Sequence, residues 1–154
     1  MRTPLVRKIL VPVDLSKRES PLRDYAIGIA SQMGAELLYF AVIDSPTILH
    51  LIESHPSDAE THDEGLRAKT VADAKVLLRR MVDRAAEAGV RATGHAILSE
   101  KLRREVIREA KERGVDLILV GSAEGSAFWR LLIGDSAEEI MHRAPCPVLC
   151  YRSS

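Results

Sequence analysis

The feature that most constrains this fold is the regular alternation of short apolar runs with helical stretches. The apolar runs are too short for helices and have the length and Val, Ile and Leu content of buried strands. Strands that alternate with helices predict right-handed crossovers and a parallel sheet. We therefore expect an α/β fold with a doubly wound five-stranded parallel sheet and helices on both faces. The expected strands span residues 8–14, 36–43, 90–98, 116–120 and 147–151.

Helix boundaries follow from a few small residues. Ser20-Pro21 predicts a helix start, with serine as N-cap and proline in the first turn. A glycine after each apolar-periodic stretch predicts a helix end. These glycines are Gly34, Gly89 and Gly114, which close helices expected over 20–33, 63–88 and 102–113. A last short helix is expected over 135–142.

The whole chain, residues 1–154, is expected to form one domain, because it contains no internal repeat or linker. Asp44 to about Thr61 is the least regular stretch, and we interpret it as a surface excursion with a helical turn at 48–52. Its histidines, at 50, 55 and 62, are five and seven residues apart. That spacing puts no two of them on one helix face, so no metal site is predicted there.

The stretch Val115–Ile140 is the strongest functional signal. It predicts a buried strand, a loop containing Gly121, Gly125 and Gly134, and a helix that begins near Asp135. Such a loop suits a phosphate, because glycine allows close approach and the free N–H groups of the helix point at the anion. Glycines that serve turn geometry alone are the alternative interpretation.

If the strand order is 3-2-1-4-5, the order reverses between the first and fourth strands. Ligands of such sheets bind at the carboxyl ends of the strands on either side of this reversal. Asp14, at the end of the first strand, would then face the Gly121 loop. Asp14 could bind ribose hydroxyls there, or cap the turn that follows the strand.

Charge and cysteine content exclude some functions and favour a compartment. The chain has 22 Lys and Arg against 22 Asp and Glu, so no cationic surface for nucleic acid or membranes is expected. No apolar run approaches a membrane span. Cys146 and Cys150 would lie about 13 Å apart on a strand, too far for a disulfide. We expect them reduced on one buried face and the protein in the cytoplasm.

No catalytic set can be identified. The sequence lacks a Walker-type phosphate loop, and no serine has a His and Asp at a spacing that identifies partners. An enzyme is therefore not predicted, although a weak ATPase activity stays open.

Several motifs together resemble a single-domain universal stress protein over nearly the whole chain. They are Ile9-Leu-Val-Pro-Val-Asp14 with Ser16, Ala41-Val-Ile-Asp44, Asp116-Leu-Ile-Leu-Val-Gly121, Arg130-Leu-Leu-Ile-Gly134 and Ala144-Pro-Cys-Pro-Val-Leu149. The resemblance implies the adenine-nucleotide α-hydrolase-like fold, the strand order 3-2-1-4-5 and a stress-linked role. It also implies a homodimer joined through the last strand, Pro147–Tyr151.

Family members that bind ATP resemble G-x-x-G-x9-G-S/T across the loop. Gly121 and Gly134 match the first and third glycines, but Glu124 takes the second position and Asp135 the hydroxyl position. Asp14 matches the acid that contacts the nucleoside, and Val42 a residue that lines the adenine pocket. The resemblance thus implies a site that comprises Pro12, Val13, Asp14, Val42, Val120, Gly121, Gly125, Gly134, Asp135 and Ser136.

The two acids weaken the phosphate loop. A carboxylate about 4 Å from a phosphate oxygen repels it by about 4 kcal/mol at an effective dielectric near 20. A bridging Mg²⁺ would reverse this effect, because it prefers carboxylate and phosphate oxygens. We expect ATP or another adenine nucleotide, with Mg²⁺ if the acids are bridged. A dimeric interaction module that binds an unknown protein partner and no nucleotide is the alternative.

Overall fold

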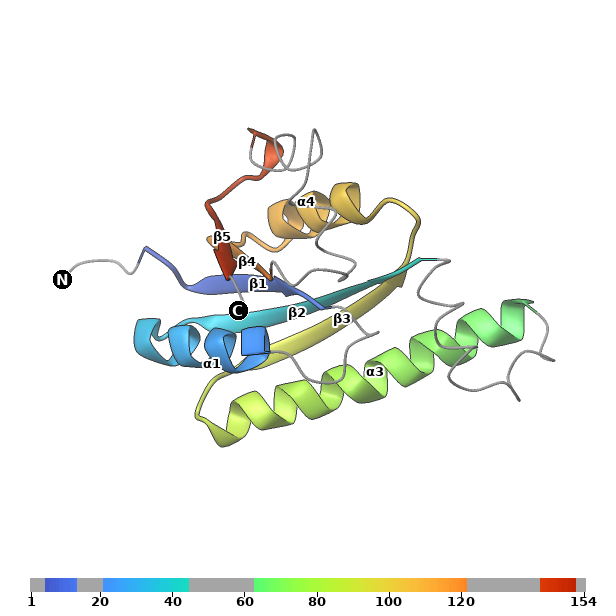
Figure 1. The fold of residues 1–154 in the computed structure, drawn as a ribbon, viewed down its shortest axis with the longest axis horizontal. Helices are drawn as coiled ribbons and strands as arrows, with labels where there is room; N and C mark the ends of the chain where they lie inside the picture. The colour runs from blue at the N-terminus through green and yellow to red at the C-terminus, as the bar shows by residue number, and fades with distance from the viewer. Residues whose placement is uncertain (1–4, 14–20, 45–62, 122–141, 152–154) are drawn as a thin grey trace.

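The computed structural model describes residues 5–13, 21–44, 63–121 and 142–151. Its five strands form one sheet in the order β3-β2-β1-β4-β5 (Figure 1). Every pair of neighbouring strands is parallel. The predicted fold class and strand order are confirmed. The strands are β1 (Lys8–Pro12), β2 (Glu36–Ile43), β3 (Ala92–Leu98), β4 (Leu117–Gly121) and β5 (Val148–Tyr151).

Helices cover both faces of the sheet, as expected. The helices α1 (Pro21–Met33) and α3 (Asp63–Glu87) lie on one face, and α4 (Leu102–Glu112) lies on the other (Figure 1). Pro21 is the first residue of α1, as the sequence predicted. Each face has its own apolar cluster, with Leu78 and Met81 of α3 in one and Val106 and Ala110 of α4 in the other.

β1 shows why the central strands are continuously apolar. Ile9 and Val11 pack toward α1 and α3, while Leu10 between them packs in the cluster under α4. All three side chains are buried. A strand covered on both faces needs an apolar residue at every position, whereas the edge strand β3 is only partly buried.

The predicted glycine stops have a common geometry. Gly34, Gly89 and Gly114 all have positive φ, between 63° and 78°. After each one, the next residue donates its N–H to the carbonyl five residues earlier, as in Ala35 N to Ala30 O at 2.9 Å. This is the Schellman end of a helix, for which glycine has no steric penalty. Three helices therefore enter three strands through the same turn.

The boundaries differ from expectation by a residue or two. β3 begins at Ala92 and not at Val90, because the Val90 N–H is bonded to Ala85 O in the helix end. Asp44, expected to begin a surface excursion, is buried. The helical turn at 48–52 lies outside the described residues. So does most of the helix predicted over 135–142, although residues 142 and 143 are helical.

The expectation of two buried cysteines is wrong for Cys150. Both thiols are free, but Cys146 is half-buried and Cys150 is exposed. The cause is that β5 is an edge strand, paired only with β4 among the described residues. Burial, with a smaller effect of the Asp116 carboxylate, raises the pKa of the Cys146 thiol. Within the part of the chain described, no helix has the length and apolarity to cross a membrane.

Candidate functional site

The carboxyl ends of β2, β1 and β4 lie next to one another, because these strands are consecutive in the sheet. The chain order reverses between β1 and β4, which places the switch point there. The fold thus brings together five of the residues expected at a ligand site. They are Pro12, Val13, Val42, Val120 and Gly121.

The valines of this group are part of the core. Val13 is 5% exposed, Val42 9% and Val120 1%. Val13 packs on the face of α1 and α3, whereas Val42 and Val120 pack under α4, so the residues lie on both faces of the sheet. The Val13 N–H is donated to Phe40 O at 2.8 Å. These valines support a site mainly as an apolar floor, and the Val13 N–H is already used by the sheet.

Gly121 has a packing reason to be glycine. Its φ is not positive, unlike that of the helix-ending glycines. A Cβ on Gly121 would meet Leu22 Cδ2 of α1 at 3.2 Å. The missing side chain therefore lets the first turn of α1 lie against the end of β4. Close helix–strand contact is a recognised use of glycine beside nucleotide sites, distinct from approach to a phosphate.

The remaining predicted site residues lie outside the described residues. They are Asp14, Gly125, Gly134, Asp135 and Ser136, together with the acid Glu124. Their assignment to the site stays a prediction from the sequence.

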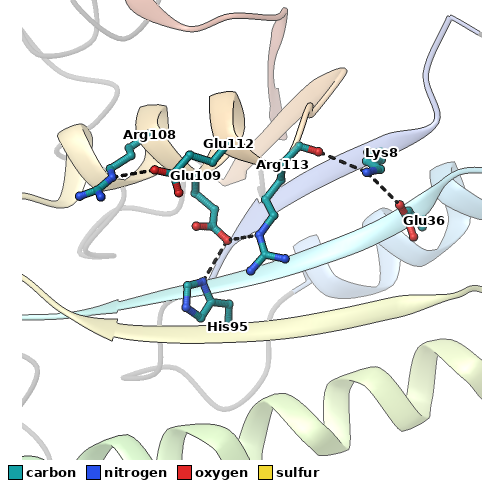
Figure 2. A network of polar contacts seen from close by, with 7 residues as sticks. All are labelled: Lys8, Glu36, His95, Arg108, Glu109, Glu112 and Arg113. Carbon is teal, nitrogen blue, oxygen red and sulfur yellow. Dashed lines mark hydrogen bonds and ion pairs between the residues drawn. The ribbon is translucent and has the colours of Figure 1, made fainter.

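A polar cluster that the sequence did not point to lies on the α4 face. His95 Nδ1 of β3 is 3.0 Å from Glu109 Oε1 of α4, and Arg113 Nε is 3.2 Å from the same oxygen (Figure 2). An ionised carboxylate only accepts hydrogen bonds, so we infer that Nδ1 carries the hydrogen. The Glu109 side chain is only 9% exposed.

The cluster continues toward the start of the sheet. Lys8 Nζ donates to Arg113 O at 3.2 Å and lies 3.8 Å from Glu36 Oε1 (Figure 2). These contacts join α4 to β3 and β1, and none of the residues that make them has a hydroxyl or thiol group. We interpret the cluster as an anchor for α4. Sequence periodicity shows that Glu109 and Arg113 share a helix face, but nothing in it pairs them with a histidine on a strand.

Comparison with known proteins adds a family and a fold. The sequence model of the universal stress protein family matches residues 6–152. A putative universal stress protein from Staphylococcus epidermidis is 30% identical, and the match covers 96% of this chain and 84% of that protein.

Solved structures agree with the fold. A universal stress family protein from Burkholderia pseudomallei has TM-score 0.69 at 21% identity, covering 99% of this chain and 100% of its own. A universal stress protein in complex with cAMP has TM-score 0.59 at 21% identity, with 97% and 98% covered. The Archaeoglobus fulgidus protein in complex with dAMP has TM-score 0.58 at 18% identity, with 95% and 98% covered. On the family match over nearly its whole length, the chain belongs to the universal stress protein family.

Proposed function

We propose that this protein is a cytoplasmic regulatory module that binds an adenine nucleotide at the switch point between β1 and β4. The observation that carries the proposal is the adjacency of the β2, β1 and β4 carboxyl ends where strand order reverses. Two structural relatives were solved with cAMP and dAMP, which supports an adenine ligand. The proposed site takes Pro12, Val42 and Gly121 from the described strand ends.

The sequence-derived part of the site comprises Asp14 and the loop with Gly125, Gly134, Asp135 and Ser136. We propose that Asp14 contacts the ribose and that the loop is a degenerate phosphate cradle. Glu124 and Asp135 oppose a triphosphate unless Mg²⁺ bridges the oxygens. Without metal, the site therefore favours ligands with less phosphate charge than ATP.

Titration calorimetry with ATP, with and without Mg²⁺, and with cAMP tests this function. The double variant Asp135→Ser/Glu124→Gly should bind metal-free ATP at least about tenfold more tightly, because two repulsive charges are removed. The matched control Asp83→Ser/Glu87→Gln removes two exposed acids from the C-terminal end of α3. This end leads into the amino end of β3, whereas the proposed site lies at the carboxyl ends of the strands. The control should leave the affinity unchanged. Equal affinities in the wild type and the first variant would contradict the electrostatic argument.

We also propose that the chain is a single domain that forms a homodimer through residues 147–151. β5 is a short strand at the edge of the described sheet, with Cys150 exposed and its other residues partly buried, which supports pairing with a second copy. Light scattering that detected only a 17.0 kDa species would contradict the dimer. A dimer without heat from any of these nucleotides would favour the alternative, a module that binds an unidentified protein partner.

A further inference from the structure

Two tyrosines from distant parts of the sequence stack beside the edge of the sheet. The rings of Tyr25 in α1 and Tyr151 in β5 have centroids 4.6 Å apart and planes inclined by 25°. Tyr151 is paired in register with Gly121 of β4. The stack therefore lies one strand away from the proposed ligand site, and on the edge strand proposed to pair with a second copy.

Leu22 connects the same helix to the site itself. It lies three residues before Tyr25, so the two side chains are neighbours on one face of α1. Leu22 Cδ2 lies 3.2 Å from the position that a Cβ on Gly121 would take. The first turn of α1 thus touches the end of β4 through Leu22 and the end of β5 through Tyr25.

We propose that Leu22, Tyr25 and Tyr151 link occupancy of the nucleotide site to self-association along β5. This regulation rests on the proposed function, both for the ligand and for the dimer. A ligand that contacts the Gly121 backbone fixes the end of β4, and the partly buried Leu22, which packs against that end, shifts with it. The position of α1 then decides how well the Tyr25 ring stacks on Tyr151, and the stack positions the end of the pairing strand.

The size of the effect is limited by the contact that transmits it. An aromatic pair contributes enough to change an equilibrium constant by about two- to tenfold. Linkage is reciprocal, so the factor by which saturating nucleotide strengthens the dimer equals the product of the factors by which dimer formation strengthens binding at the two sites.

The test measures the dimer dissociation constant by sedimentation with and without saturating cAMP. Wild type should dimerise about two- to tenfold more tightly with cAMP. Tyr25→Ala should reduce that ratio to about one, while Tyr25→Phe keeps the ring and the ratio. The matched control Met33→Ala removes an exposed apolar side chain from the other end of α1 and should keep the wild-type ratio. Calorimetry on each variant reports cAMP affinity independently.

The outcomes separate this proposal from the one on which it rests. A wild type that binds cAMP and dimerises equally with and without it overturns the coupling and leaves the proposed function intact. A Tyr25→Ala protein that keeps the wild-type ratio also overturns the coupling. Absence of heat from ATP, ATP with Mg²⁺ and cAMP overturns the proposed nucleotide binding and with it the coupling. Absence of a dimer overturns the proposed self-association and the coupling, and leaves nucleotide binding standing. The coupling is supported if cAMP no longer strengthens the Tyr25→Ala dimer but still strengthens the Tyr25→Phe dimer. A folding defect common to both variants would show in their melting temperatures.

Discussion

Gly94 of β3 is required by its contact with a helix. A Cβ at Gly94 would lie 2.9 Å from Leu78 Cβ of α3, closer than side chains tolerate. Leu78 is itself 2% exposed, so it has little room to move away. Gly94→Ala should therefore lower the free energy of unfolding by about 1–3 kcal/mol, measured by urea denaturation.

Gly28 provides the matched control. It lies inside α1, and a Cβ there would meet nothing within 4 Å. Gly28→Ala should raise stability by about 0.5–1 kcal/mol, because alanine restricts the unfolded chain and favours the helix. If both substitutions shifted stability in the same direction, the packing explanation for Gly94 would be wrong.

Tyr39 should make stability fall at alkaline pH. Its side chain lies in the core, and burial raises its pKa to about 12, with Arg23 and Arg84 acting in the opposite direction. Between its ordinary value of 10.0 and about 12, the unfolded chain loses the phenolic proton while the folded chain keeps it. The folded state then binds more protons, so stability falls as pH rises through this window.

Tyr39→Phe should lack this component. Relative to the variant, the free energy of unfolding of the wild type should fall by up to about 3 kcal/mol between about pH 10 and 12. Below pH 10 the difference between the two proteins should not change with pH. Urea midpoints of the two proteins across this range provide the measurement. Parallel pH profiles would show that another group causes the alkaline loss.

At the scale of one element, α4 makes its described polar contacts with the sheet at its C-terminal end. Its N-cap residue, Lys101, makes no side-chain capping bond. Glu109, by contrast, is buried in the contact with β3 and accepts from both His95 and Arg113. Glu109→Ala should therefore cost about 1–3 kcal/mol of unfolding free energy, since both partners lose their acceptor.

An exposed ion pair on the same helix is the comparison. Arg108 and Glu112 lie 3.0 Å apart with both side chains more than half exposed, so Glu112→Ala should change little. His95→Ala combined with Glu109→Ala should cost less than the sum of the single losses if the two side chains act together. If the two losses of unfolding free energy are additive, the contact between His95 and Glu109 does not contribute to stability.

For the whole molecule, the two sheet edges should respond differently to charge. Cys150→Lys places a cation on the exposed side of β5, and like charges from two copies would repel along the proposed pairing edge. We expect the dimer dissociation constant to rise at least about tenfold by light scattering. Thr93→Lys places the same charge on an exposed position of the other edge, β3, and should leave it unchanged. Equal effects would assign the interface elsewhere.

The fold could be predicted from the sequence because the apolar periodicity of each element agrees with the proline and glycine residues at its boundaries. The apolar runs, Pro21 and Gly34, Gly89 and Gly114 all have local causes, which a sequence displays directly. The exposure of Cys150 was not accessible, because it depends on which strand lies at an edge. The contact of His95 with Glu109 joins residues whose sequence neighbours give no hint of it. The strand-end part of the candidate site followed from topology, and the loop part still rests on motif resemblance.

The three glycine turns and the proposed ligand site lie at opposite ends of the strands. Each turn connects a helix to the amino end of a strand, so the turns fix the geometry at the amino ends of these strands. The segments that follow β1, β2 and β4 begin at the carboxyl ends of the strands. Substitutions at the carboxyl ends of the strands can therefore change the proposed ligand site without altering the glycine turns at the amino ends.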